Sequence, residues 1–262
     1  MPLSTMIART SLPHIHASPD PLKKPNTPYG LPIIEDCVSC VVRDSGFFCG
    51  ISQSSLTALD EIKYTTSYPK GALLFVEGQT PRGVYILCEG QAKLLTTSRD
   101  GRTLMLKIAQ PGDVFGLNSV MTGKPYELTV EILQPSQLAF IGREDFLRFL
   151  KKNADARLQT VLHLSRDCHS AYDVIRSIGL CHSVPERLAR LLLDQSAGGR
   201  LSEGVVRVKL TLTHEEMAQL IGSSRESVTR TLTEFKKRGT AELHGSTLLI
   251  RDKAALESLA AQ

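Results

Sequence analysis

The sequence predicts an α+β protein in which a small β-roll is followed by a long helix and then by a helical module with a terminal hairpin. Three observations predict this order: short β-rich runs alternate with turns from about Tyr64 to Arg143, apolar residues recur at helical spacing from about Asp155 to Gly179, and a compact helical pattern follows Pro185. We therefore expect four parts, which are a tail (1–36), a cysteine-containing segment with the β-roll (37–152), a pairing helix (153–180) and the C-terminal module (181–262).

The composition is that of a folded protein of more than one domain. The chain has 262 residues, of which 42% are hydrophobic and 22% are charged, so it can bury a sizeable core. Its net charge of +4 is too small to indicate a nucleic-acid partner by itself. Neither an apolar run long enough to span a membrane nor a signal peptide is found, which favours the cytoplasm. In that compartment six cysteines indicate metal, redox chemistry or core packing rather than structural disulfides.

The N-terminal region changes character near residue 37. Six prolines fall within residues 1–30, a composition that does not form a packed core. Three cysteines follow at Cys37, Cys40 and Cys49, and a short helix is expected over Ser52–Ile62, with three apolar residues on one face.

The β-roll is predicted from seven short runs, with turns marked by Pro69–Gly71, Glu89-Gly90, Asp100-Gly101 and Pro111–Asp113. The expected strands are Ala72–Val76, Gly83–Cys88, Gln91–Thr97, Thr103–Ile108, Asp113–Gly116, Leu128–Ile132 and Gln137–Ile141.

The long helix carries apolar residues at alternating steps of three and four. This spacing is typical of a seam that pairs with a second copy of the same helix, formed here by Val161, Leu164, Cys168, Ala171, Ile175 and Ile178. The alternative is a face that packs on the β-roll of the same chain.

The C-terminal module contains a helix-turn-helix pattern. Thr213 and Glu216 have the spacing of a capping box, and Ser223 and Glu226 repeat it ten residues later. Gly222 lies between the two helices and permits a sharp turn. A β-hairpin wing is expected after the second helix, which is predicted over about Ser224–Arg238.

The second helix has the chemistry of a DNA reader. Arginine can form two hydrogen bonds to a guanine edge, and glutamate can accept from the amino group of cytosine. From Ser223 to Arg238 the chain carries five basic and two acidic residues, so the charge is basic where the whole chain is nearly neutral. The expected DNA-binding residues are Ser223, Ser224, Arg225, Glu226, Thr229, Arg230, Lys236 and Lys237. The alternative is an αα-hairpin with an exposed charged face.

In this order of parts, and in the run Ser224–Arg230, the chain resembles the Crp/Fnr superfamily of bacterial transcription regulators over roughly residues 50–250. The resemblance implies a homodimer that binds a palindromic DNA site, and RNA polymerase as a further partner if the protein activates transcription. Arg225, Glu226 and Arg230 are similar to the Crp-type reader, which implies a TGTGA-like half-site; Thr229 departs from that pattern.

The resemblance also implies a cyclic-nucleotide-binding-like β-roll, but the sequence argues against cyclic AMP. Members that bind cyclic nucleotides carry a glutamate after a Phe-Gly pair and then an arginine that neutralises the phosphate. Here Asn118 follows Phe115-Gly116, and the stretch from Pro125 to Thr129 contains no arginine. A phosphate would therefore lack its charge-assisted contact.

The cysteines are the expected sensor. Fnr-type members carry an oxygen-labile [4Fe-4S] cluster on an N-terminal cysteine group, which implies an oxygen or nitric oxide sensor here. The candidate ligands are Cys37, Cys40, Cys49 and Cys88, although Cys88 also fits core packing, and a non-cysteine residue or a small molecule is an alternative fourth ligand. A thiol–disulfide switch, a zinc site and no special role are the other interpretations. Cys168 and Cys181 are expected to be packing residues.

Two other classes of function were compared with a regulator. The sequence contains no nucleophile elbow, no phosphate-binding glycine-rich loop and no HExxH motif, so we expect no enzyme. A small-molecule-binding module whose C-terminal part contacts only proteins is the second alternative; unlike a regulator, it would not show salt-dependent binding to duplex DNA.

Overall fold

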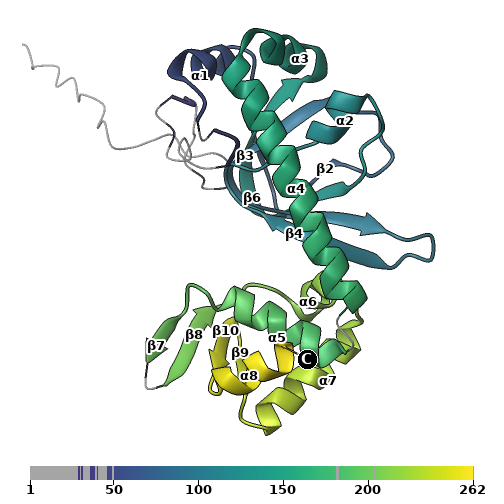
Figure 1. Ribbon diagram of the computed structural model, residues 1–262, viewed down its shortest axis with the longest axis vertical. Coiled ribbons are helices and arrows are strands. Elements are labelled where there is room, and N and C mark those ends of the chain that lie inside the picture. Colours follow the sequence, from purple (N-terminus) through teal and green to yellow (C-terminus); the bar gives the residue numbers. More distant parts are fainter. Residues whose placement is uncertain are drawn as a thin grey trace, which may run out of the picture.

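The structure is a computed structural model that describes residues 29, 31, 36–38, 40, 46–48, 50–180, 183–202 and 204–261. A β-roll and a C-terminal module lie at opposite ends of the molecule, and the long helix α4 (Ala154–Leu180) runs from one to the other (Figure 1). Within the described residues, no helix combines the length and apolar character that crossing a membrane would require.

The β-roll is a six-stranded antiparallel sheet. Its main order is β1-β6-β3-β4, while β2 pairs with β6 and β5 pairs with β3. The strands are β1 (Tyr64–Tyr68), β2 (Leu73–Phe75), β3 (Gly83–Thr97), β4 (Thr103–Ala109), β5 (Val114–Phe115) and β6 (Thr129–Gly142). Two buried apolar clusters fill the roll, and the larger one also contains Phe47, Leu56 and Phe146 from the helices around it.

Two of the strands are longer than the sequence predicts. The pair Glu89-Gly90 is not a turn, because β3 continues through it with shifts of register against β6. Gly90 has a φ of 96°, and a Cβ atom there would lie 2.1 Å from Oγ of Ser136 on β6. Glycine therefore permits a bulge at which the two strands approach each other closely, and the predicted pairs of short strands become single bent ones.

Short helices cover one end of the roll. They are the 3₁₀ helix η1 (Gly46–Phe48), α1 (Gln53–Asp60), α2 (Leu117–Thr122) and α3 (Arg143–Lys152). The carboxylate of Asp155, in the first turn of α4, accepts hydrogen bonds from the backbone N–H of Ser52 at 2.7 Å and from the hydroxyl of Ser55 at 2.8 Å. These bonds fix the start of α1 to the start of α4.

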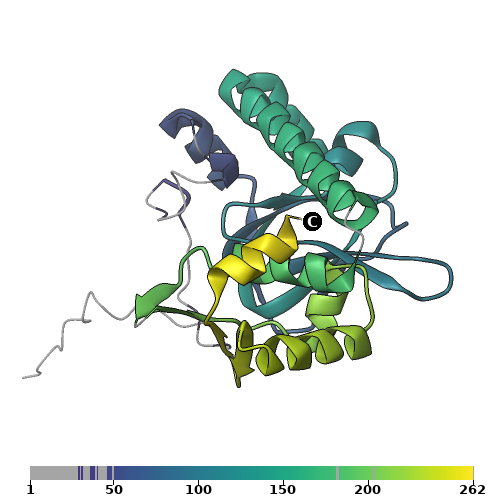
Figure 2. The ribbon, with the colours of Figure 1, turned by 60° about the horizontal axis from the view of Figure 1, so that its bottom comes forward.

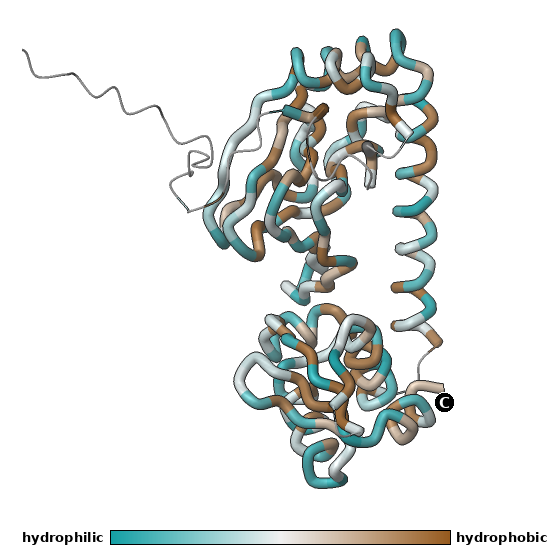
Figure 3. The backbone as a smooth tube through the Cα atoms, turned by 90° about the vertical axis from the view of Figure 1, so that its left-hand side faces the viewer, coloured by the Kyte–Doolittle hydropathy of each residue, from teal (hydrophilic) through white to brown (hydrophobic). Residues whose placement is uncertain are grey.

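Most of α4 is not covered by its own chain. Its buried residues are Ala156, Thr160 and His163, all in the half beside the roll. The hydropathy view shows apolar positions continuing along α4 below the roll, where the helix stands free (Figure 3). The exposed large apolar residues of this helix are Leu158, Val161, Leu162, Tyr172, Ile175 and Leu180.

The C-terminal module combines four helices with a four-stranded sheet of order β7-β8-β10-β9. The helices are α5 (Val184–Gln195), α6 (His214–Leu220), α7 (Arg225–Lys237) and α8 (Lys253–Ala260), and the strands are β7 (Arg200–Ser202), β8 (Val205–Lys209), β9 (Ala241–His244) and β10 (Thr247–Ile250). The expected hairpin is the pair β9–β10. Strands β7 and β8, which the sequence patterns do not predict, extend this sheet across the module (Figure 2).

The β-roll touches the C-terminal module through β4 and α6. Ile108 of β4 packs against the apolar core of the module. Beside it, Nζ of Lys93 lies 3.9 Å from Oε1 of Glu216 and 3.1 Å from a carboxylate oxygen of Glu131. The two parts are thus in direct contact and are not joined by α4 alone.

Candidate nucleic-acid interface and sensory site

The turn between α6 and α7 is built as the sequence indicates. Thr213 caps α6: its hydroxyl accepts from the N–H of Glu216 at 3.1 Å, and Oε2 of Glu216 accepts from the N–H of Thr213 at 2.8 Å. Gly222 has a φ of 59°, and the next N–H, that of Ser223, donates to the carbonyl of Ala218 at 2.9 Å. Buried Ala218 and Val228 lie in one apolar cluster, so the two helices pack tightly on each other.

Removing the cap of α6 should weaken this module. In Thr213→Ala the N–H of Glu216 loses its side-chain acceptor and the carboxylate of Glu216 loses the hydroxyl that donates to it. We expect a loss of about 1 kcal/mol in the free energy of unfolding. Thr233→Ala is the matched control, because Thr233 is exposed in the middle of α7, where alanine favours the helix. Urea unfolding followed by circular dichroism measures both; equal stability of the two variants would contradict the role of the cap.

The second helix starts one residue later than the sequence suggests. Its N-cap is Ser224, whose hydroxyl accepts from the N–H of Ser227 at 3.2 Å. The predicted capping box of Ser223 with Glu226 is therefore wrong in register. Glu226 still lies in the first turn, and hydrogen bonds from its own backbone N–H and from Ser224 lower the pKa of its carboxyl group. The carboxylate is thus ionised and held at the start of the helix.

Helix α7 has one buried and one exposed face. Val228, Thr231, Leu232 and Phe235 are buried in the module. The other face exposes Ser224, Arg225, Glu226, Thr229, Arg230, Lys236 and Lys237, whereas Ser223 is half-buried. The predicted DNA-binding residues thus lie together at one surface of the module.

The two arginines at the start of α7 are available for a ligand. Within the described part of the chain, neither Arg225 nor Arg230 forms an ion pair with a carboxylate, while Lys236 lies 3.7 Å from a carboxylate oxygen of Glu242. Thr229 is already engaged: its hydroxyl donates to the carbonyl of Arg225 at 2.9 Å and lies 2.8 Å from Nδ1 of His214. His214 also belongs to this surface; the sequence pattern does not indicate it, because only the packing of α6 on α7 brings it there.

The structure brings three of the four candidate cysteine ligands near one another. Cys37 and Cys88 are buried in the same apolar cluster, with 5% and 7% of their surface exposed, and Cys40 is half-buried. Burial raises the pKa of Cys88 to about 12, and the nearby thiols of Cys37 and Cys40 add to that rise. Cys49 and Cys181 lie outside the described residues. Cys168 is exposed on α4 rather than packed.

Cys37 is held by neighbours from the end of α1. Its N–H donates to Oδ1 of Asp60 at 3.2 Å, and Nζ of Lys63 lies 3.2 Å from its sulfur. Burial nevertheless raises the pKa of Cys37 to about 11, because it outweighs the effect of the Lys63 cation. Both buried thiols are therefore protonated at neutral pH, a state in which cysteine is a poor nucleophile.

Cys88 lies beside the late strand of the roll. Strands β3 and β6 pair in a register that sets Ile86 opposite Ala139. A hydrogen bond with the backbone of Ala139 lowers the pKa of the Cys88 thiol, although burial has the larger, opposite effect. The stretch Gln137–Phe140 of β6 itself contains no cysteine. Cys88 thus supplies a sulfur from the neighbouring strand to the same part of the roll.

The donor set formed by these cysteines is soft. Among the described residues, no group of three His, Cys, Asp or Glu side chains is already arranged to hold a metal ion. The nearness of Cys37 and Cys40 to Cys88 nevertheless fits thiolate ligands drawn from two segments, and thiolates suit an iron–sulfur cluster or zinc.

The helix η1 connects the cysteine segment to α4. The ring of Phe47 is fully buried, 6.3 Å from the ring centres of both Phe146 and His163. The N–H of Phe47 donates to the carbonyl of Gly112 at 2.9 Å, and Nη2 of Arg166 on α4 donates to the carbonyl of Gly46 at 3.4 Å. A displacement of η1 would therefore change its contacts with both α4 and the turn before β5.

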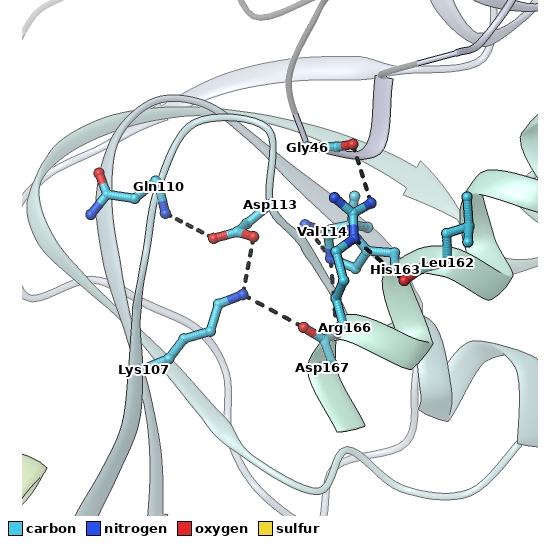
Figure 4. A network of polar contacts seen from close by, with 9 residues as sticks. All are labelled: Gly46, Lys107, Gln110, Asp113, Val114, Leu162, His163, Arg166 and Asp167. Carbon is cyan, nitrogen blue, oxygen red and sulfur yellow. Dashed lines mark hydrogen bonds and ion pairs between the residues drawn. The ribbon is translucent and has the colours of Figure 1, made fainter. Parts of the chain in front are cut away.

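A polar network continues from this point (Figure 4). Nε2 of His163 accepts from the N–H of Val114 at 3.4 Å, and burial lowers the pKa of this histidine, so its ring is neutral. Nζ of Lys107 lies 3.0 Å from Oδ1 of Asp113 and 3.5 Å from Oδ1 of Asp167 on α4. Lys107 precedes Ile108, the β4 residue that packs on the C-terminal module.

Half of the predicted helical seam faces its own chain. Leu164 packs against the core of the roll, and the side chain of Ile178 lies close to Gly222 in the C-terminal module. Val161, Cys168 and Ile175, which are seven residues apart, are exposed. Ala171 is also exposed and lines the cavity described next.

A cavity of about 480 Å³ lies between the β-roll and α4. The roll contributes Phe75, Leu94, Phe115, Tyr126 and Val130 to its wall, and α4 contributes Leu164, Ala171 and Val174. Glu127 and Asn118 are among its few polar lining residues, and their side chains are hydrogen-bonded to each other.

Comparison with known proteins matches the two parts of the chain separately. Residues 65–153 match the cyclic nucleotide-binding domain family, and residues 186–259 match the Crp-like helix-turn-helix domain family. A CRP-like cAMP-activated global transcriptional regulator of Mycobacterium tuberculosis is 29% identical, over 82% of this chain and 96% of the relative. The nitrogen fixation regulation protein FixK of Azorhizobium caulinodans is 26% identical, over 73% and 77%.

Solved structures show the same fold. FixK2 from Bradyrhizobium japonicum superposes with a TM-score of 0.64 at 21% identity, covering 77% of this chain and 98% of that one. The regulator CLP of Xanthomonas campestris, described as responsive to c-di-GMP, gives a TM-score of 0.68 at 19% identity, covering 76% and 99%.

Proposed function

We propose that this chain, which belongs to the Crp/Fnr superfamily of transcription regulators, binds a two-fold symmetric DNA site as a homodimer in the cytoplasm. The relatives compared above are regulators and not enzymes. The observation that supports this most directly is the exposed face of α7. It presents Arg225, Glu226 and Arg230 at the N-terminal end of the helix, which is the end that enters the major groove. Lys236 and Lys237 lie further along the same helix, where they can contact phosphates.

A homodimer is supported by the uncovered face of α4. Val161 and Ile175 are 62% and 64% exposed, and with Leu158, Leu162 and Tyr172 they leave a long apolar surface on one helix. Contiguous apolar surface of this kind marks an interaction site. Pairing of two such helices would bury it and would place the two reading helices about 34 Å apart, one turn of DNA.

We propose that the cysteines hold the signal-sensing group, a [4Fe-4S] cluster that responds to oxygen or nitric oxide. Cys37, Cys40 and Cys88 would be ligands, with Cys49 as the fourth. When bound, the cluster supplies oxygen-labile chemistry that protein side chains lack. The placement of Cys37 and Cys88 in one buried cluster of the roll supports this assignment, because thiolates drawn from two segments are typical ligands of iron–sulfur clusters.

The chain's own residues explain how a change at the cysteines would reach the DNA. Helix η1 follows Cys40 and carries the buried Phe47, so movement of the cysteine segment acts on His163 and Arg166 of α4. The pair of Lys107 with Asp167 joins α4 to β4, and β4 contacts the C-terminal module. For regulation, the two signalling states must differ in dimer affinity or in the separation of the reading helices.

Selection of duplexes from a random library tests the proposed function. We expect enrichment of an inverted repeat whose half-sites are centred one helical turn apart, TGTGA-like if Arg225 and Arg230 read as in Crp-type members. We also expect affinity that falls steeply with salt, because phosphate contacts release counterions. Absence of any enriched sequence would contradict the proposal, and so would salt-independent binding. If the selected site lies upstream of a promoter and activates it, RNA polymerase is the expected further partner.

Substitution of Cys88 tests the sensing group. After anaerobic isolation, we expect Cys88→Ala to lose most of its bound iron and sulfide, because one thiolate ligand is removed. Cys168→Ala is the matched control, since Cys168 is exposed on α4 and remote from the proposed ligands in sequence. Iron and sulfide assays measure both, and thermal unfolding of the iron-free proteins checks that each is folded. Equal iron in the parent and in Cys88→Ala would exclude Cys88 as a ligand, and an iron-free parent that binds DNA would exclude the cluster.

A further inference from the structure

The cavity between the β-roll and α4 does not fit the cyclic nucleotide that its fold family implies. We propose that it binds an uncharged, mainly apolar small molecule and that this ligand bridges the roll and α4. The inference deepens the proposed function and rests on it for its regulatory consequence, whereas binding itself does not depend on DNA recognition.

The charged groups of the cavity exclude an anion. Lys107 is the only cation among the described residues that line it, and its ammonium group is already paired with the carboxylates of Asp113 and Asp167. Asp167 and Glu127 add two negative charges to the lining. A cyclic phosphate would thus enter a net negative site without a free cation, and burial of an unpaired charge is strongly unfavourable.

Two polar side chains of the lining, Asn118 and Glu127, are held by bonds within the protein. One carboxylate oxygen of Glu127 accepts from the hydroxyl of Ser119 at 2.8 Å, and the other accepts from the amide of Asn118. These bonds engage both carboxylate oxygens of Glu127 and the amide nitrogen of Asn118. A ligand therefore needs few hydrogen-bonding groups of its own.

The size and walls of the cavity indicate the ligand class. About 480 Å³ lies within the range of small-molecule sites, which is roughly 300–1,000 Å³. Aromatic and aliphatic side chains from β2, β3, β5 and β6 form one side, and Leu164, Ala171 and Val174 of α4 form the other. A molecule of one or two rings would contact both sides, so its binding would favour the arrangement in which α4 lies against the roll.

Two fluorescent probes that share the same rings test the charge requirement on the full-length protein. N-phenyl-1-naphthylamine is neutral, and 1-anilinonaphthalene-8-sulfonate adds one sulfonate. We expect the neutral probe to bind saturably, at one molecule per chain, with an affinity at least about tenfold higher than that of the sulfonate. In Glu127→Gln the difference between the affinities for the neutral probe and for the sulfonate should be smaller, because the substitution removes a negative charge from the lining. We expect no displacement of the neutral probe by millimolar cyclic AMP.

A pair of leucine substitutions locates the site. Leu94→Trp fills the cavity and should lower the affinity for the neutral probe about tenfold or more. Leu73→Trp is the matched control, since Leu73 lies exposed on β2 outside the lining, and it should bind as the parent does. Circular dichroism confirms that each variant is folded.

The possible outcomes separate this inference from the proposed function. Equal affinity for the two probes, displacement by cyclic AMP, or unchanged binding by folded Leu94→Trp would overturn the inference while DNA selection still succeeds. Failed DNA selection with saturable probe binding would contradict the proposed function alone. Probe binding that persists in Leu94→Trp but disappears on dimerisation would place the probe on the free face of α4.

Discussion

Replacing Arg225 or Arg230 with alanine is expected to weaken binding to the selected DNA site by about 1–3 kcal/mol for each substitution, or roughly 5- to 150-fold. Both side chains are exposed at the first turns of α7, and within the described chain no carboxylate pairs with either. Each is therefore free to form two hydrogen bonds to a guanine edge. Fluorescence anisotropy with the selected duplex, and with duplexes changed at one base pair, measures both affinity and specificity.

Alanine substitution of the two arginines should affect base specificity, unlike substitution of the lysines of the same helix. Loss of a base contact relaxes the preference at one position of the half-site, whereas Lys236→Ala and Lys237→Ala should weaken all duplexes alike and reduce the salt dependence. Arg102→Ala is the control for the arginine substitutions, since its side chain is 88% exposed on the β-roll. If Arg225→Ala and Arg230→Ala bind the selected site as tightly as Arg102→Ala does, α7 does not read the bases through these residues.

Placing an aspartate on the free face of α4 is expected to prevent formation of the proposed dimer. In Val161→Asp and Ile175→Asp the side chain is exposed within one chain, so the fold is retained, but pairing would bury an unpaired charge between two helices. Because a palindromic site gains affinity from two linked contacts, we expect DNA affinity to fall by more than about 100-fold. Analytical ultracentrifugation measures the mass, and anisotropy measures DNA binding.

Leu73→Asp is the matched control for these two variants. Leu73 is an exposed leucine on β2, so aspartate there tests the effect of a new surface charge away from α4. It should leave both the mass and the DNA affinity unchanged. A dimeric Ile175→Asp protein with parental affinity would show that this face of α4 does not form the subunit contact.

The local patterns predicted the elements best where each element depends on its own sequence. The capping residue Thr213, Gly222 of the turn and the amphipathic spacing of α7 specify the helix-turn-helix, and the structure contains it. The β-roll was harder to divide into strands, since Glu89-Gly90 has the composition of a turn and only its contact with Ser136 makes it a bulge. Strands β7 and β8 were missed because their short, partly charged sequences become a hairpin by pairing with β10.

The candidate sites required the tertiary structure. Strand alternation predicted that Cys88 lies in the core, and the structure confirms this. The pattern could not predict that Cys37 and Cys40 lie near Cys88, because they belong to a separate segment before α1. The heptad spacing on α4 identified exposed Val161 and Ile175, yet the same spacing includes Leu164, which packs on the roll. Periodicity shows which residues share a face, and only the fold shows what covers it.

The carboxylate of Glu216 serves two partners with separate oxygen atoms. Oε2 caps α6 through Thr213, while Oε1 faces Lys93 of the β-roll at 3.9 Å. Separation of the C-terminal module from the roll would break the pair with Lys93 and the packing of Ile108, but it would leave this cap of α6 in place. Lys93 keeps Glu131 as a partner after separation, at 3.1 Å. Glu216 thus keeps its bonds to Thr213 and Lys93 keeps Glu131, so opening this contact would leave neither charged side chain without a partner.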